Sequence, residues 1–300
     1  MPQLHVLTVI SNPVRFQSRY QLFREFEERM RQQGVRLHVA EAAFGAREHM
    51  ITRADHPDHL QLRTRHELWH KENMLNLLLA RLPADWEYCA WIDADVAFAR
   101  PDWAHETLQQ LQHHSVVQMF SQAHDLGPDY EAFDRRRSFA SSYLAGASAS
   151  KSYGDWHPGY AWAWRRDALD AVGGFIDWAP LGSADYHMAH ALVGNLQRSM
   201  QAKFPGAYAE SLRAWERRAA VLRKNVGVVQ GTLYHFWHGK KKDRQYVSRE
   251  SVIVNNQFDP AKHLIRDTQG LYQLAPDVPI DLRDGIRRYF RARNEDSNEL

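Results

Sequence analysis

The stretch from Tyr88 to Phe98 constrains this chain most, because a short apolar run ends there in two acidic residues one position apart. The run has the character of a buried strand, and its burial fixes the backbone that carries Asp93 and Asp95. Two carboxylates held close together repel each other unless a cation lies between them, and Mg²⁺ or Mn²⁺ takes oxygen ligands. The pattern predicts a divalent-metal site at a strand end. The alternative is a strand cap and a turn, since D-x-D alone is a weak motif.

The composition is that of a soluble globular protein, with 44% hydrophobic and 25% charged residues. A net charge of +2 gives no bulk electrostatic reason to expect nucleic acid or an anionic membrane as partner. The single cysteine, Cys89, excludes an internal disulfide framework and is typical of a reducing compartment. No run approaches the roughly 20 apolar residues of a membrane span, and the N-terminal residues do not have the pattern of a secretory signal. We therefore expect a cytoplasmic protein without a membrane span.

Apolar periodicity predicts strands and helices in alternation along the first 120 residues. We expect strands at 4–10, 35–39, 88–92 and 116–120, helices at 18–33, 66–82 and 103–111, and a polar loop at 44–65. Such alternation is typical of an α/β fold with a mostly parallel central sheet and helices on both faces. Ligands of such folds bind at the carboxyl ends of the strands, which is where Asp93 and Asp95 lie.

The second half of the chain is less regular. Residues 121–156 are rich in Gly, Ser, Ala and Tyr and contain the basic cluster Arg135 to Arg137, so we expect a substrate loop there. Short helices are predicted at 165–172 and 185–193, a basic surface helix at 212–222, and a strand at 226–236. The tail from residue 243 onward is expected to wrap the domain.

Three further features carry possible chemistry. His235 and His238 follow a predicted strand at a spacing that lets both imidazoles share one ion with a carboxylate, because imidazole nitrogen binds Mn²⁺ and Zn²⁺ well. Chance proximity is the alternative, since the chain has 17 histidines. Asp185 is an isolated acid in a setting rich in Gly and Trp. The basic run from Gly239 to Arg244 suits a diphosphate, or is a solvated charge run.

In their order along the chain, five blocks resemble GT-A glycosyltransferases, most closely the inverting family 2, β-1,4-galactosyltransferase and polypeptide GalNAc-transferase group. The blocks are residues 10–15, 69–76, 91–95, 159–185 and 235–238. The resemblance implies a Rossmann-like nucleotide-diphospho-sugar transferase fold, of bacterial or phage type. It covers about residues 4–250. We therefore expect a glycosyltransferase domain at 1–250 and, at 251–300, a C-terminal extension packed on the same domain.

The resemblance also implies a role for each matching residue. Asp95, His235 and His238 would ligate the metal, Mn²⁺ or Mg²⁺, and Asp185 would be the catalytic base. The donor-binding residues would be Pro13, Arg15, Trp69, Lys71, Asp93 and Lys241, and the acceptor-binding residues Tyr160, Trp162 and Trp178. Two positions depart from the family: Ala184 replaces the first acid of the pair before the base, and His235 stands where the galactosyltransferases have Met.

These assignments predict metal-dependent transfer of a hexose from a nucleotide sugar, a UDP-hexose, to an acceptor hydroxyl, with inversion. A phosphatase of the HAD type also uses D-x-D, but Ala97 stands where its Thr is normally found. Two alternatives stay open: a sugar- or nucleotide-binding protein without turnover, and a phage-type enzyme that glycosylates hydroxymethylated DNA bases. In the second case Arg135 to Arg137 and the basic helix would contact phosphates. The sequence identifies neither the sugar nor the acceptor glycan.

Overall fold

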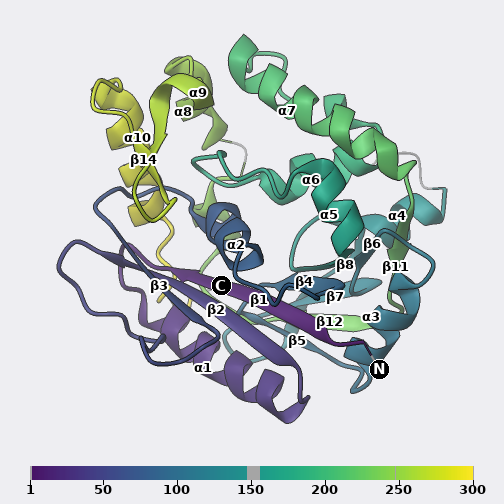
Figure 1. Ribbon diagram of the computed structural model, residues 1–300. Helices are drawn as coiled ribbons and strands as arrows, with labels where there is room; N and C mark the ends of the chain where they lie inside the picture. Colours follow the sequence, from purple (N-terminus) through teal and green to yellow (C-terminus); the bar gives the residue numbers. More distant parts are fainter. Residues whose placement is uncertain (1, 147–155, 247, 300) are drawn as a thin grey trace.

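The fold is organised around a seven-stranded sheet in the order β11-β6-β10-β4-β1-β2-β3 (Figure 1). The computed structural model describes residues 2–146, 156–246 and 248–299. All neighbouring strands are parallel except β10, which runs antiparallel to both β4 and β6. The strands are β1 (Leu4–Ser11), β2 (Arg36–Phe44), β3 (His59–Thr64), β4 (Tyr88–Ile92), β6 (Val116–Gln118), β10 (Ala161–Arg165) and β11 (Val226–Val228). The predicted α/β fold with a mostly parallel sheet is confirmed.

A second sheet of five strands has the order β5-β12-β7-β8-β9. Its strands are β5 (Val96–Phe98), β7 (Gln122–Leu126), β8 (Ala132–Ser138), β9 (Trp156–His157) and β12 (Thr232–His235). Two of the points at which the chain changes sheet lie between β4 and β5 and between β11 and β12. The acidic motif lies at the first of these changes, and the histidine pair lies at the end of the strand that follows the second. The sheet topology therefore brings the two motifs to one region.

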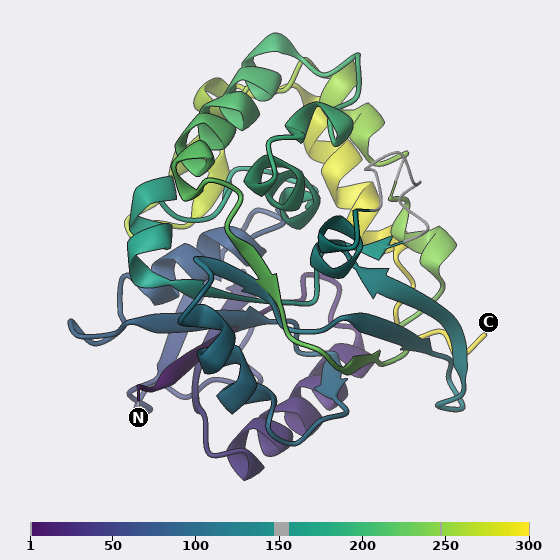
Figure 2. The same cartoon turned by 90° about the vertical axis from the view of Figure 1, so that its right-hand side faces the viewer.

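Helices cover both faces of the large sheet. Figures 1 and 2 show α1 (Gln17–Gln32) on one side and most of the helices of the second half of the chain on the other. The further helices are α2 (Lys71–Leu79), α3 (Trp103–Leu111), α4 (Phe139–Leu144), α5 (Arg166–Val172), α6 (Ala184–Leu192), α7 (Gly206–Ala219), α8 (Glu250–Asn255), α9 (Pro260–His263) and α10 (Ile280–Ala292). A small hairpin of β13 (Leu264–Arg266) and β14 (Tyr272–Leu274) lies between α9 and α10.

Strand β1 is buried on both faces and so joins two parts of the core. Leu4 and Val6 pack with Phe26 and Met30 of α1, whereas Leu7 belongs to the larger cluster under α2. This near-continuous apolar run is the pattern expected of a central parallel strand. On the α2 side, the ring of Trp91 packs against those of Trp162, Trp164 and Phe175, and Trp164 also contacts Phe175.

Several predicted elements differ from the structure. The expected loop at 44–65 contains β3, and the part of the expected loop 121–156 that is described contains β7, β8 and α4. Residues 147–155 of that loop lie outside the described residues. The expected strand at 226–236 is divided into β11 and β12. Helix α2 begins at Lys71 instead of 66, because Trp69 donates its backbone N–H to Pro180 outside the helix.

Residues 251–299 contact the rest of the fold at several points. Asn73 of α2 donates to the carbonyl of Gly270 and accepts from the backbone N–H of Tyr272. At the N-terminus of α1, the amides of Gln17 and Ser18 donate to the carboxylate of Asp296. Ser18 therefore lies inside α1 and does not cap it. Over the described part of the chain, no helix has the length and apolar character that a membrane crossing requires.

We expect Trp162→Ala to lower the free energy of unfolding by about 3 to 5 kcal/mol, because the ring is 1% exposed and its removal leaves a large cavity. Urea denaturation followed by fluorescence measures this difference. Val221→Ala is the control, since Val221 is 60% exposed and its truncation should change the same free energy by less than about 0.5 kcal/mol. Equal stability of the two variants would contradict a core role for Trp162.

Candidate functional site

A cavity of about 360 Å³ opens at the carboxyl ends of β1 and β4. This is the position predicted for the binding crevice of a mostly parallel sheet. Residues from separate parts of the chain line it. Among them are Thr8 to Pro13, Leu68 to Glu72, Trp91 to Asp95, Tyr160, Asp185, His235, His238, Arg244, Arg249, Phe290, Arg293 and Glu295. The cavity thus collects the ends of the strands, the starts of α2 and α6, and the C-terminal tail.

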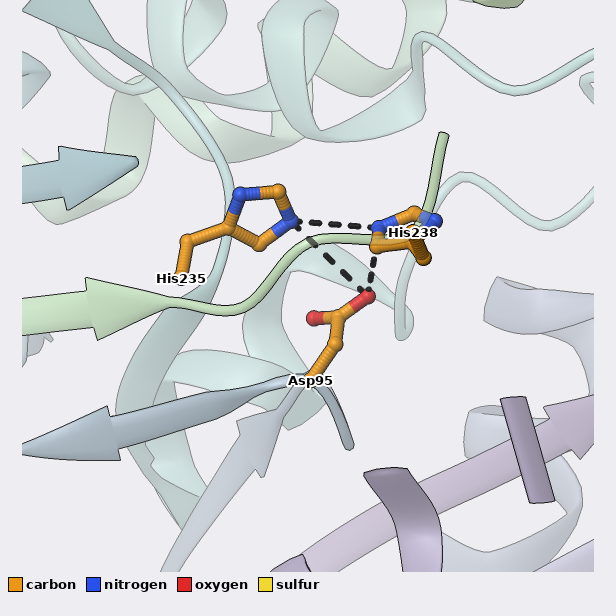
Figure 3. A group of neighbouring side chains, drawn as sticks. All are labelled: Asp95, His235 and His238. Carbon is orange, nitrogen blue, oxygen red and sulfur yellow. Dashed lines mark hydrogen bonds and ion pairs between the residues drawn. The ribbon is translucent and has the colours of Figure 1, made fainter. Parts of the chain in front are cut away.

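The side chains of Asp95, His235 and His238 converge on one point of this cavity (Figure 3). Asp95 Oδ2 lies 3.0 Å from His238 Nε2 and 3.9 Å from His235 Nε2. The two Nε2 atoms are 3.2 Å apart. The register of β12 explains the convergence. Strand β12 pairs with both β5 and β7, and its pairing with β5 places His235 opposite Val96, the residue that follows Asp95.

These three donor atoms fit a divalent cation. An ion with ligands at about 2.1 Å needs neighbouring donors about 3.0 to 3.5 Å apart, close to the separations observed. Among the described residues, the buried Oδ1 of Asp95 has no hydrogen-bond partner, so a further interaction there is open to a ligand. One carboxylate oxygen and two imidazole nitrogens form a donor set suited to Mn²⁺ or Zn²⁺.

The protonation states at this point favour metal binding. Burial alone would raise the pKa of Asp95, but the neighbouring His238 and His235 lower it well below its ordinary value. Burial lowers the pKa of His235, although Asp125 and Asp95 act in the opposite direction. An ionised carboxylate and a neutral imidazole are the forms that bind metal.

Lys71 connects the start of α2 to the acidic motif. Its Nζ forms an ion pair with Asp93, and both side chains line the cavity. Burial alone would lower the pKa of Lys71, but Asp93, Glu72 and Asp185 raise it, so the amine stays protonated. Asp93 therefore pairs with an amine, whereas Asp95 lies next to the imidazoles of His235 and His238.

Asp185 lies in the first turn of α6 and faces the cavity. Its Oδ1 accepts the backbone N–H of Tyr186 at 2.8 Å, and its Oδ2 lies against Gly159. A Cβ at position 159 would collide with this oxygen, so glycine there leaves room for the carboxylate. Ser183, which precedes the helix, adopts a left-handed conformation with φ of 71°. The loop before α6 is thus shaped to present Asp185.

The structure places the other predicted site residues in two groups. Pro13, Trp69 and Tyr160 line the cavity together with Asp93, Lys71 and Asp185. Tyr160 donates its hydroxyl to Asp125 at 2.7 Å. The ring of Trp69 packs on Gly182 and lies 5.2 Å from the guanidinium of Arg293.

Arg15, Trp162, Trp178 and Lys241 lie outside this group. Arg15 adopts a positive φ and points to Met50, while Arg19 lines the cavity instead. Trp162 is a core residue, because its indole packs on Trp91 and donates to the carbonyl of Pro158. Trp178 packs edge-on against Tyr208 and lines a separate cavity together with residues of α2, α5 and α7.

Lys241 is held away by acids of the second sheet. Its Nζ pairs with Asp125 and Asp134, and Arg244 of the same basic run lines the cavity. The guanidinium of Arg244 is 6% exposed and donates to the hydroxyl of Tyr246. None of the acids in the described part of the chain forms an ion pair with Arg244. Sequence reasoning identified the basic run but not which of its members faces the cavity.

Glu72 is a site residue that sequence reasoning missed. It lines the cavity beside Lys71, is 4% exposed, and burial raises its pKa to about 8. A signal was present, because Glu72 precedes Leu75 by three positions and Leu79 by seven, which puts this acid on the apolar face of the helix. The C-terminal lining residues, Phe290, Arg293 and Glu295, carried no comparable signal, since the tail shows no motif.

The pKa of Glu72 predicts a pH-dependent stability. Folding raises this pKa from an ordinary value of 4.5 to about 8, so the folded state holds the proton more tightly. The resulting stabilisation is complete below pH 4.5 and is lost as pH rises through 8. Glu72→Gln stays neutral at every pH. We therefore expect its free energy of unfolding, relative to that of wild type, to rise by a few kcal/mol between pH 5 and pH 8. Urea denaturation at both pH values in the presence of chelator measures this, with the exposed Glu48→Gln as control. The prediction is contradicted if the difference in free energy of unfolding between Glu72→Gln and wild type is the same at both pH values.

No protein-family model matches the sequence, and no curated protein sequence matches it either. Solved structures do match. One is the catalytic domain of Drosophila β1,4-galactosyltransferase 7 in complex with xylobiose, with a TM-score of 0.43, 12% identity, and coverage of 95% of this chain and 99% of that chain. Another is glucosyl-3-phosphoglycerate synthase from Mycobacterium tuberculosis in complex with Mn²⁺, UDP and phosphoglyceric acid, with a TM-score of 0.41, 10% identity, and coverage of 92% and 87%.

A mutant of the same Drosophila enzyme, solved with manganese, UDP-galactose and xylobiose, matches with a TM-score of 0.44, 11% identity, and coverage of 95% of this chain and 98% of that chain. These similarities concern the path of the chain and extend over nearly all of it.

Proposed function

We propose that this protein is a metal-dependent glycosyltransferase that moves a hexose from a UDP-sugar to an acceptor hydroxyl. The observation that carries the proposal is the convergence of Asp95, His235 and His238 on one point of the cavity at the strand ends. A bound Mn²⁺ or Mg²⁺ would offset the negative charge that develops on the departing diphosphate. The predicted inversion of the anomeric centre and the choice of UDP as nucleotide belong to this proposal.

The cations of the cavity support a negatively charged donor. Arg244 is a buried guanidinium that lines the same cavity, and burying an unpaired charge is costly unless a ligand supplies the opposite charge. We infer that Arg244 binds a donor phosphate, the role that the sequence suggested for Lys241. Lys71 holds Asp93 in place, and Trp69 and Pro13 line the side on which the nucleotide would bind.

Asp185 is proposed as the general base for the acceptor. It lies in the first turn of α6 and faces the cavity. From this position it would take the proton of an attacking hydroxyl. Tyr160 lines the same space and would contact the acceptor.

Some of the basic residues that suggested a DNA acceptor form ion pairs with acids of this chain. Arg136 pairs with Asp134, and Arg213 and Arg217 pair with Glu210 on the same helix. We therefore favour an acceptor glycan. A nucleotide-binding protein without turnover is the outcome that the next experiment separates from an enzyme.

Incubation with a panel of nucleotide sugars and Mn²⁺ should release nucleotide from one donor, and chelator should stop the release. We expect Asp95→Asn to lower the rate by roughly 10² to 10³-fold, because it removes a charged ligand of the metal. Asp102→Asn, which alters an acid paired with Arg100 on the surface, should leave the rate unchanged. Nucleotide binding without release from any donor would favour a binding protein.

Asp185→Asn tests the base separately from the metal. The variant should keep wild-type affinity for Mn²⁺ and UDP, because Asp185 is not among the converging donor atoms. Its transfer rate should fall by roughly 10² to 10⁴-fold, the usual contribution of a general base. Calorimetry for binding and nucleotide release for turnover distinguish the two effects. A variant with an unchanged transfer rate would remove Asp185 from the mechanism.

A further inference from the structure

Each of the two histidines faces a carboxylate with the ring nitrogen that points away from Asp95. For His235 this contact is a formed hydrogen bond: Nδ1 lies 2.8 Å from Oδ1 of Asp125. Asp125 comes from β7 and is the residue opposite His235 in the parallel pairing of β12 with β7. It is 3% exposed, and Tyr160 and Lys241 contact it as well. The backbone register of the second sheet thus fixes the ring of His235.

For His238 the corresponding contact comes from the C-terminal tail. Its Nδ1 is buried and, among the described residues, has no hydrogen-bond partner. Oε2 of Glu295 lies 3.7 Å from this nitrogen. Glu295 is 1% exposed and forms ion pairs with Arg19 and Arg293. Although burial alone would raise the pKa of Glu295, these two arginines and His238 lower it far below its ordinary value.

The tail is held at this place from two sides. The carboxylate of Asp296 accepts the amides of Gln17 and Ser18, at 2.9 and 2.8 Å, at the start of α1. On the other side, the indole N–H of Trp237 donates to the carbonyl of Ser297 at 2.6 Å. Gly239 contacts the backbone of Asn294 so closely that a Cβ there would lie 2.6 Å from its carbonyl oxygen. Residues 294–297 therefore fill the space between α1 and the segment that carries His238.

We propose that Glu295 and Asp125 are positioning residues of the metal site, and that the C-terminal tail thereby forms part of it. This inference rests on the metal site of the proposed function. A carboxylate that accepts Nδ1–H fixes the tautomer in which Nε2 carries the lone pair, and it makes the imidazole a stronger ligand. Both Nε2 atoms already face Oδ2 of Asp95. The tail would then be required for metal affinity although it supplies no ligand.

Affinity for Mn²⁺ alone, measured by calorimetry and by electron paramagnetic resonance of the free ion, tests the proposal. We expect Glu295→Gln and Asp125→Asn each to weaken Mn²⁺ binding by about 10 to 100-fold. Two matched controls should stay within twofold of wild type. Asp134→Asn alters the other acid that contacts Lys241, and Asp296→Asn alters the acid that docks the tail without touching a histidine.

The ligand-field absorption of bound Co²⁺ supplies a readout that loss of tail docking alone would not move. Glu295→Gln should shift these bands, and Glu295→Asp, which keeps the charge, should restore part of the affinity. A Mn²⁺ affinity of Glu295→Gln equal to wild type, with His238→Ala unable to bind, would overturn the positioning role while the metal site stands. An equal loss in Asp296→Asn and Glu295→Gln would also overturn it, because docking of the tail would then explain the effect.

Two further outcomes complete the test. Retention of Mn²⁺ affinity in both His238→Ala and Asp95→Asn would instead refute the metal site itself, and with it the proposed function. Thermal unfolding of each variant identifies any that does not fold. If Glu295→Gln does not fold, the Mn²⁺ affinities of Asp125→Asn and Asp134→Asn are compared to test whether the carboxylates position the histidines. Equal Mn²⁺ affinity in that pair would overturn it.

Discussion

The pairing of β12 with β5 on one side and with β7 on the other is the interaction on which the site depends. It brings His235 beside Val96 and opposite Asp125, so an acid motif and a histidine motif more than 130 residues apart in sequence share one cavity. A shift of this register by one residue would turn His235 to the other face of the sheet. The hydrophobic residue Leu233, which is fully buried, holds the register and thereby the site.

Charge balance follows from this arrangement. Three acids in or next to the cavity are paired with cations of the protein: Lys71 pairs with Asp93, Lys241 with Asp125, and Arg19 and Arg293 with Glu295. Asp95 differs from these three acids, because its carboxylate faces two imidazoles. Burial lowers the pKa of one of them, His235. No lysine or arginine in the described part of the chain forms an ion pair with Asp95, so we propose that an external cation supplies the compensating charge at this point. Arg244 presents the opposite case. Its buried guanidinium forms no ion pair with an acid of the described residues, and we propose that an anion of the donor supplies the opposite charge.

The sequence predicted the elements with strong periodicity and failed for those without it. Helix α3 has the predicted bounds, and β1 and α5 differ by a single residue at one end. By contrast, β3 and β8 were read as loop, because half-exposed strands carry charged and polar side chains at alternate positions. The role of Trp162 was misjudged for another reason. A tryptophan that fills the core and one that stacks on a sugar look the same in a sequence, and only packing distinguishes them.

The sequence by itself determined the class of the fold and identified the candidate ligands of the proposed metal site, because apolar periodicity and the short spacings within Asp93–Asp95 and His235–His238 are local properties. Only the tertiary structure decided which charged groups reach the cavity. Arg244 enters it while Lys241 turns to Asp125, and Glu295 arrives from a tail that carries no motif. The physical reason is that burial, ion pairing and strand register depend on residues distant in sequence, and these contacts exist only once the two sheets and the tail have come together.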